Sequence, residues 1–170
     1  MKKFLLLFIS ILTFANPFNI NSFEADFTQT ILDETGKKIQ YTGHLKAMQP
    51  YYALWSYEKP IKKDVYINSN RIVIIEPELE QAIIKRIESK FNFFTLLSQA
   101  KKVDNFTYTT NFMDTKFTII LQKDLKIKTI FYLDDFENNT TINFTNQKTD
   151  IEIPQDIFEP SIPVDYDTIL

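Results

Sequence analysis

Apolar and polar side chains alternate along most of this chain, beginning at residue 23. One face of this first segment carries Phe23, Ala25, Phe27, Gln29 and Ile31, whereas the residues between them are acidic or threonine. A period of two residues is typical of a strand with one buried face. Turn-forming residues follow over 33–36 and the alternation resumes over 39–46, which predicts an antiparallel hairpin.

The same alternation predicts a series of further strands. They cover residues 51–57, 65–67, 71–75, 81–87, 106–112, 117–121, 127–133 and 140–144. Large apolar side chains mark the predicted buried faces, such as Trp55, Phe117 and Phe131. Because hairpin-sized turns separate most of these segments, an antiparallel sheet is predicted.

Residues 91–100 break this alternation. Apolar side chains, among them Phe94, Leu96 and Leu97, recur there at the spacings of a helix. The tail, residues 151–164, contains three prolines and is predicted to be an extended edge or loop.

Many strands interrupted by one helix predict a mainly β fold with a single curved antiparallel sheet. Such a sheet either closes into a barrel or stays an incomplete, half-open β-barrel with a short helical lid. Only two glycines are present to relieve bending of the strands, which favours the half-open barrel.

The first 15 residues have the organisation of an export signal. Two lysines precede an apolar run over residues 4–12, and a small-residue cleavage site ends at Ala15. The run is shorter than the roughly 20 residues that a membrane-spanning helix needs. We therefore expect cleavage near Ala15 and a soluble exported protein, with residues 16–170 forming a single domain.

Composition and charge argue against several classes of function. The chain has 19 Lys plus Arg and 22 Asp plus Glu, and without the two lysines of the signal its net charge is 17 − 22 = −5. This acidity disfavours nucleic-acid binding. The chain has no Cys, which excludes thiol enzymes and thiolate metal sites.

Candidate catalytic chemistry is sparse. His44 is the only histidine and lies on the polar face of its strand without a second ligand, and Asp134-Asp135 is typical of a turn. Neither a nucleophile–base motif nor a glycine-rich phosphate loop is present. We therefore expect no enzyme activity, no metal and no cofactor.

A series of short motifs follows the signal-like segment in a fixed order. They are Phe23-x-Ala25-x-Phe27-x-Gln29, Gly43, Pro50, Trp55, Pro60, Glu76-Pro77, Glu80-Gln81-Ala82 and Leu96-Leu97. In this order and spacing, over residues 22–100, the chain resembles the LolA family of periplasmic lipoprotein carriers. The ending, with Phe158, Pro160 and Pro163, also looks like the proline-containing tail of that family.

The resemblance implies a periplasmic carrier that has no catalytic activity. An inner-membrane ABC transporter would release lipoproteins to it, and it would hand them to an outer-membrane acceptor. The implied acyl-chain cavity comprises Phe23, Phe27, Leu45, Trp55, Phe117, Ile119 and Phe131, and the implied lid comprises Phe94, Leu96 and Leu97. The physical argument agrees, since an aromatic-lined hollow can shield acyl chains from water.

Two features depart from the family. An Arg that ties the lid shut usually precedes the proline that here is Pro50, whereas this chain has Gln49. A neutral amide offers fewer donors and no charge, so we expect weaker or differently arranged lid closure. The family also usually has an amphipathic helix before its first strand, but only residues 16–22 precede Phe23.

Other functions remain open at this point. An exported lipocalin-like binder of apolar small molecules or free lipids would use the same curved apolar sheet, and a hydrolase of envelope lipids would need a nucleophile–base motif that is missing. We expect a monomer. Asn139 follows Glu137 by two residues and precedes Thr141 by two, which resembles an extended bacterial glycosylation site; the alternative is an unmodified polar turn.

Overall fold

The computed structural model describes residues 17–87, 92–112, 114–134 and 136–170. The strands in these ranges are β1 (Ser22–Leu32), β2 (Lys38–Met48), β3 (Tyr52–Lys59), β4 (Lys63–Asn68), β5 (Arg71–Glu76), β6 (Gln81–Arg86), β7 (Lys101–Lys102), β8 (Thr107–Phe112), β9 (Thr115–Leu121), β10 (Ile127–Leu133), β11 (Asn139–Thr149) and β12 (Asp167–Ile169). Helix α1 spans Phe93–Ser98, and two 3-10 helices, η1 and η2, span Pro77–Leu79 and Gln155–Phe158. Within the described ranges no helix has the length and apolar character needed to cross a membrane.

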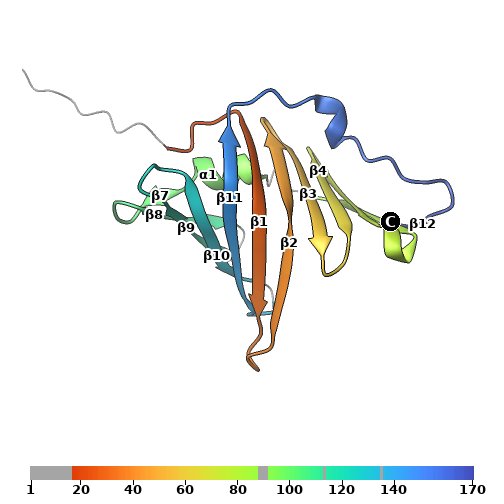
Figure 1. Ribbon diagram of the computed structural model, residues 1–170, viewed down its shortest axis with the longest axis horizontal. Coiled ribbons are helices and arrows are strands. Elements are labelled where there is room, and N and C mark those ends of the chain that lie inside the picture. Colours follow the sequence, from red (N-terminus) through yellow and green to blue (C-terminus); the bar gives the residue numbers. More distant parts are fainter. Residues whose placement is uncertain (1–16, 88–91, 113, 135) are drawn as a thin grey trace, which may run out of the picture.

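All of these strands form one open sheet. Its order is β12-β6-β5-β4-β3-β2-β1-β11-β10-β9-β8-β7, and only β12, beside β6, pairs in parallel. Strand β1 lies between β2 and β11, so that Phe23 is opposite Thr149 although the two are far apart in sequence. Figure 1 shows β1, β2 and β11 at the centre of the sheet, with β3–β6 on one side and β7–β10 on the other.

The predicted fold class is confirmed. The protein is mainly β, its single sheet does not close, and one short helix lies against it. The predicted strands correspond to β1–β6 and β8–β11, and the predicted helix corresponds to α1. Strands β7 and β12 were not predicted, because two or three residues are too few to show an alternation.

The main hydrophobic core covers the face of the sheet that we call the inner face, defined by the side chains of Phe23 and Phe27. Helix α1 packs on this face through its four buried apolar residues. The ring of Phe93 on α1 lies 4.9 Å from that of Phe23, and Phe144 on β11 lies 5.5 Å from Phe23. In the view of Figure 1, α1 therefore lies behind the sheet.

The C-terminal tail covers part of the opposite, outer face. Its η2 segment contacts β3 and β4, and Phe158 at its end is fully buried, with its ring 5.5 Å from that of Tyr52. Over 151–164 the tail is a loop interrupted by η2, one of the two predicted alternatives, and β12 then joins the edge of the sheet. Buried Val73 and Ile75 on β5 belong to the outer face, because they pair with Tyr66 and Asp64.

The prediction for Phe131 is wrong. Its side chain is 36% exposed and lies on the outer face, whereas its neighbours Ile130 and Tyr132 face inward. The register between β9 and β10 shifts between Ile127 and Thr129. Such an irregularity adds one residue to a strand and reverses the alternation beyond it.

Candidate functional site

An apolar pocket of about 220 Å³ lies between α1 and the inner face of the sheet. Its lining comes from α1 and from six strands, β1, β3, β4, β9, β10 and β11. The residues are Gln29, Trp55, Tyr57, Val65, Ile67, Phe93, Leu96, Phe117, Ile130, Tyr132 and Ile142. A mainly hydrophobic and aromatic lining with few polar groups is typical of a site for an apolar ligand.

The strand alternation positions the aromatic wall of this pocket. Trp55 and Tyr57 are two residues apart on β3 and therefore share the inner face. Phe27 on β1 packs edge-on against both rings, with centroid distances of 5.1 Å and 5.0 Å. Phe27 itself is buried and belongs to the core against which Trp55 and Tyr57 pack.

One end of the pocket is polar. The Tyr57 hydroxyl donates a hydrogen bond to the side-chain oxygen of Gln29, at 3.0 Å. Burial raises the pKa of Tyr57, and the nearby Tyr132 and Tyr41 raise it further, so the hydroxyl stays protonated and acts as a donor. The ammonium of Lys63 lies 4.6 Å from the ring centroid of Tyr57 and 5.4 Å from that of Tyr41.

The apolar surface continues beyond the pocket along β5 and β6. Ile74 pairs with Val65, and Ile72 pairs with Ile67, so both isoleucines share the inner face with the pocket. Ile83 extends the row onto β6 through its pairing with Ile74. These side chains are only half-buried, which leaves an accessible apolar strip beside the pocket.

A second cleft, of about 620 Å³, lies on the other side of α1. It is lined by Phe18, Asn19, Gln49, Pro50, Phe94, Thr95 and Ser98. The Gln49 side chain donates to the Ile20 carbonyl at 2.7 Å, and its backbone N–H donates to the Asn21 carbonyl at 2.8 Å. Gln49 thus fixes the segment before β1 at the rim of a cleft that α1 also lines.

Apart from Phe131, the cavity, lid and lid-closure residues predicted from sequence divide into three groups. Trp55, Phe117 and Leu96 line the apolar pocket, whereas Phe94, Gln49 and Pro50 line the second cleft. The buried core beneath the pocket contains Phe23, Phe27, Leu45, Ile119 and Leu97. Phe131 lies on the outer face, apart from all of these residues.

Several lining residues were missed by the sequence analysis. Tyr57 shares the face of Trp55, so the alternation already contained the signal for it. Ile130 and Tyr132 carried no such signal, because the irregularity in β10 reverses the faces after Ile127. Lys63 does not line the pocket but lies over the ring of Tyr57, and it was missed because a charged side chain at the start of a strand usually points to solvent.

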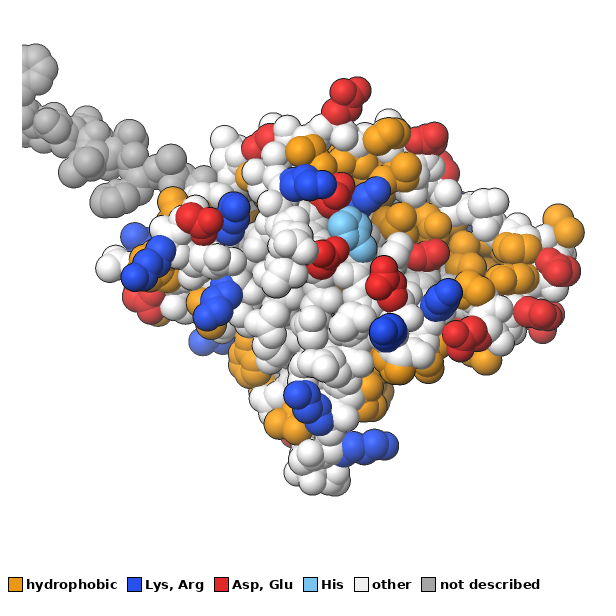
Figure 2. All heavy atoms as spheres, in the orientation of Figure 1, with side chains coloured by type: hydrophobic (Ala, Val, Ile, Leu, Met, Phe, Trp, Pro, Cys, Tyr) orange, Lys and Arg blue, Asp and Glu red, His pale blue; other side chains and the backbone are white. Residues whose placement is uncertain are grey.

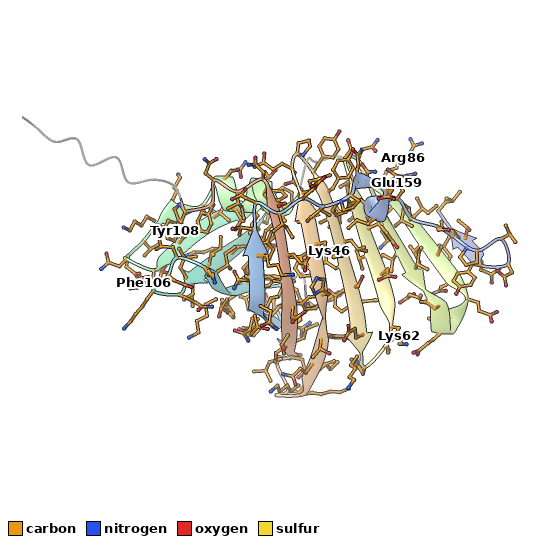
Figure 3. The ribbon with its side chains drawn as sticks, turned by 45° about the horizontal axis from the view of Figure 1, so that its top comes forward. Lys46, Lys62, Arg86, Phe106, Tyr108 and Glu159 are labelled. Carbon is orange, nitrogen blue, oxygen red and sulfur yellow. The ribbon has the colours of Figure 1, made fainter. Side chains whose placement is uncertain are left out.

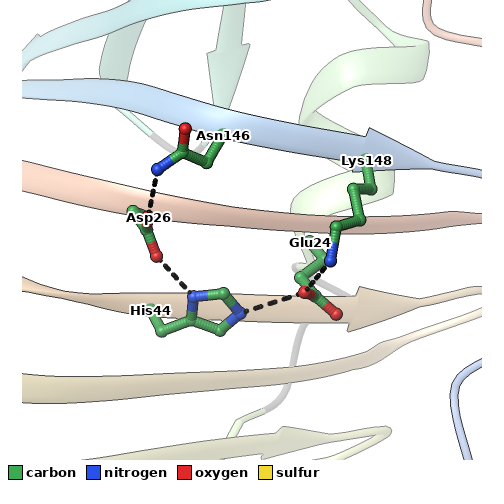
Figure 4. Close-up of polar contacts among 5 residues, drawn as sticks. All are labelled: Glu24, Asp26, His44, Asn146 and Lys148. Atoms are coloured by element: carbon green, nitrogen blue, oxygen red, sulfur yellow. Dashed lines mark hydrogen bonds and ion pairs between the residues drawn. The ribbon is translucent and has the colours of Figure 1, made fainter.

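The outer face carries a polar cluster around His44 (Figures 2 and 4). The His44 nitrogen Nδ1 lies 2.8 Å from Asp26 Oδ1, and Nε2 lies 3.6 Å from Glu24 Oε1. Lys148 donates to Glu24 at 3.0 Å, and Asn146 donates to Asp26 at 2.7 Å. In the described part of the chain, no group of three or more His, Cys, Asp or Glu side chains is arranged so that it could hold a metal ion.

The partners of these carboxylates lower their pKa values. The hydrogen bond from Lys148 is the largest cause for Glu24, and those from Asn146 and then His44 are the largest causes for Asp26. Both carboxylates therefore favour the ionised form, as expected for acceptors in a surface network rather than for general acids.

The two remaining predicted sites lie in or next to a turn. Asp134 accepts backbone hydrogen bonds from Phe136 and Asn138, each at 2.9 Å, whereas Asp135 lies outside the described residues. Asn139 is exposed at the start of β11, immediately after this turn. Its glycosylation stays a prediction.

Comparisons with known proteins agree on one family. The family model described as outer membrane lipoprotein carrier protein LolA matches residues 19–161. A protein from Campylobacter jejuni named outer-membrane lipoprotein carrier protein is 35% identical over 169 residues, covering 99% of this chain and 98% of that protein. Proteins of the same name from Wolinella succinogenes and Helicobacter pylori strain J99 are 36% and 39% identical, covering 86% and 82% of this chain and 87% and 74% of theirs.

Solved structures show a similar fold at low sequence identity. A LolA superfamily protein from Nitrosomonas europaea superposes with a TM-score of 0.55 at 7% identity, covering 84% of this chain and 91% of that one. An uncharacterised conserved protein from Thermus thermophilus gives 0.54 at 12% identity, covering 89% and 91%. At these identities the likeness concerns the fold alone.

Proposed function

The chain belongs to the LolA family of outer-membrane lipoprotein carrier proteins, and we propose that it carries lipoproteins by sheltering their acyl chains on the inner face of its sheet. Membership of this family makes it a periplasmic lipoprotein carrier. The proposal adds the site: the acyl chains enter the pocket between α1 and the sheet. The single observation that carries it is the apolar lining of that pocket, with Trp55 and Phe117 on the strands and Leu96 on the helix.

Burial of acyl chains supplies the free energy of binding. Each buried methylene contributes about 0.8 kcal/mol, so even part of one chain binds measurably. Apolar contacts have no required direction, and one surface can therefore accept different lipoproteins through their common lipid. The same property allows transfer to another apolar surface without a catalytic step.

The pocket is too small for this cargo unless α1 moves. Its volume of about 220 Å³ lies below the range of about 300–1,000 Å³ typical of small-ligand sites. Helix α1 contacts the pocket through Phe93 and Leu96, and the half-buried strip of Ile72, Ile74 and Ile83 adjoins it. We therefore infer that α1 acts as a lid, whose displacement joins the pocket to this strip.

Gln49 takes the place of a lid-closing arginine in this proposal. It holds the Ile20 carbonyl at the rim of the cleft lined by Phe94 and Thr95 of α1. An amide makes fewer and weaker hydrogen bonds than a guanidinium, so closure is easier to reverse.

We further propose the route of the cargo. The segment 1–15 is an export signal that is cleaved near Ala15, an inner-membrane ABC transporter loads the mature protein, and an outer-membrane acceptor unloads it. Neither step requires enzyme activity of the carrier.

The test is titration of the mature protein with a diacylated lipopeptide, followed through the fluorescence of Trp55. This is the only tryptophan of the chain, and it lines the pocket. We expect saturable binding that the same peptide without acyl chains does not produce. Ile67→Glu places a charge on the pocket wall and should weaken binding about tenfold or more, because a charge is costly to bury.

Gln40→Glu is the matched control, since it adds the same charge at an exposed outer position. It should bind the lipopeptide as wild type does. Equal binding by Ile67→Glu and wild type would disprove the location of the site. Binding of free lipids without binding of the lipopeptide would instead identify a small-molecule binder.

A further inference from the structure

We propose that Lys63 makes the polar end of the pocket a site for the anionic head of an amphiphile, whose hydrocarbon chain lies in the pocket. The ligand class is an amphiphile that combines an acyl chain with a carboxylate or phosphate head, as in a free fatty acid or a phospholipid. The inference rests on the proposed acyl-binding function and adds a second class of ligand to it.

The position of Lys63 in the sheet places its side chain on the inner face, beside the Tyr57 end of the pocket. Lys63 begins β4 and pairs with Tyr57 on β3, and Tyr57 lines the pocket. Residues directly opposite each other share one face of a sheet. The Lys63 ammonium accordingly lies over the rings of Tyr57 and Tyr41, which are 5.8 Å apart.

Among the described residues, no carboxylate lies within 4.0 Å of this ammonium in an ion pair. Asp64 points to the outer face, because it pairs with Ser56 on β3 and with Ile75 on β5. Glu58 is exposed at the register irregularity between β2 and β3 and forms none of these ion pairs. Glu76, two residues after Ile74 on β5, shares the inner face with Lys63, and its carboxylate accepts a hydrogen bond from the Gln81 side chain at 2.5 Å. The Lys63 ammonium thus contacts two aromatic rings and has no carboxylate within ion-pair distance among the described residues, which leaves it available to an anion.

Gln29 supplies a second polar group to the same end. Its side-chain oxygen accepts the hydrogen bond from Tyr57, so the group it can offer to a ligand is the amide nitrogen. An ammonium and an amide donor at the edge of an apolar pocket match an anionic head attached to a hydrocarbon chain.

The charge distinguishes this ligand from lipoprotein cargo. The acyl chains of a lipoprotein are in ester or amide linkages with no phosphate or free carboxylate beside them, and they gain little from Lys63. A fatty acid has a free carboxylate, and a phospholipid has a phosphate beside its ester-linked chains. Lys63 therefore sets a preference between two lipids that the apolar lining alone would not separate.

The experiment compares three ligands that each have a twelve-carbon chain: dodecanoate, dodecanol and lauroyl lysophosphatidylglycerol. Each is used below its micelle-forming concentration. Binding to the mature protein is followed through Trp55 fluorescence in wild type, Lys63→Met, Lys63→Arg and Lys62→Met. Lys62 is exposed in the turn between β3 and β4 and is the matched control (Figure 3). Thermal unfolding of each variant verifies that it is folded.

We expect Lys63→Met to bind the anionic ligands about tenfold more weakly and dodecanol equally well. Lys63→Arg should keep most of the affinity, and Lys62→Met all of it. A loss confined to dodecanoate assigns the site to fatty acids, and one confined to the lysophospholipid assigns it to phospholipids.

Three results would overturn the proposal: wild type that binds neither anionic ligand, equal losses for dodecanol and the anions, or equal effects of Lys62→Met and Lys63→Met. Failure of the carrier function is distinguishable, since wild type would then not bind the diacylated lipopeptide. If Lys63→Met does not fold, Lys63→Gln replaces it with the same expectations.

Discussion

Gly43 lies where the backbone of β3 and the ring of Phe27 both come close to β2. A Cβ atom at this position would lie 2.2 Å from the Ser56 carbonyl oxygen and 2.7 Å from the end of the Phe27 ring. The oxygen belongs to the backbone of β3 and cannot move independently of the sheet. Gly43 therefore permits both the pairing of β2 with β3 and the position of Phe27 under Trp55 and Tyr57.

Gly43→Ala should lower the free energy of unfolding by about 1–3 kcal/mol, the usual cost of overpacking. The measurement is urea unfolding of the variant against Thr42→Ala, an outer-face neighbour for which a change within about 0.5 kcal/mol is expected. Because the Phe27 ring would be displaced, the fluorescence of Trp55 should also change in the folded variant. A Gly43→Ala variant as stable as wild type would contradict the close approach.

Single residues also mark the limit of the sequence analysis. The alternation placed Phe27 and Trp55 on the correct face, because nothing interrupts the period of two between each of them and its neighbours. It failed at Phe131, because the irregularity near Lys128 has no distinctive residue type. Sequence alone also could not separate the core beneath the pocket, such as Leu45, from the pocket wall, since both need apolar side chains.

At the scale of elements, α1 has few interactions of its own to keep it helical. It spans only six residues, and isolated helices of that length are not stable in water. Its beginning is fixed by Asn92, whose side chain accepts a hydrogen bond from the Thr95 backbone at 2.9 Å. The rest of its stability comes from packing on the inner face, through residues such as Phe93 and Leu97.

Asn92→Ala should therefore loosen the proposed lid. Loss of the N-cap costs about 1 kcal/mol and raises the population of the open form about fivefold. If acyl chains bind only the open form, the apparent affinity for the diacylated lipopeptide should rise by up to that factor while the melting temperature falls. Asn92→Ser keeps a capping oxygen and serves as the control. A lower melting temperature with unchanged affinity would show that α1 does not gate the pocket.

At the scale of the whole molecule, the sequence predicted the class of fold and an open sheet but not the long-range pairings of its strands. Hairpins such as β1–β2 follow from short turns and matching faces, and these pairings were foreseeable. The pairing of β1 with β11 brings together strands that are more than 100 residues apart in sequence. The parallel pairing of β12 with β6 comes after a long proline-containing tail. Neither contact leaves a local signal, because the partners are far apart in sequence.

Acid should destabilise the whole molecule through carboxylates on the outer face and in the turns. Glu24 and Asp26 have lowered pKa values because Lys148 and Asn146 respectively bond to them, and hydrogen bonds also lower the pKa of the turn residues Asp33 and Asp104. In Asp134 burial raises the pKa, but the hydrogen bonds from Asn138 and Phe136 together lower it further than burial raises it. A carboxylate whose pKa is lower in the folded state contributes stability above its unfolded pKa. Protonation removes that contribution as the pH falls through the folded value.

Stability should therefore be constant near neutral pH and fall progressively below about pH 4. The measurement is the urea midpoint at pH 7, 5, 4 and 3. Lys148→Met removes the main partner of Glu24, so its pH dependence should be shallower than that of wild type. At pH 7 this variant should lose only about 0.5 kcal/mol, because the Lys148 side chain is 62% exposed and solvent screens the pair. A midpoint that rises on acidification would mean that the folded carboxylates are less acidic than the unfolded ones, which is incompatible with the hydrogen bonds they accept.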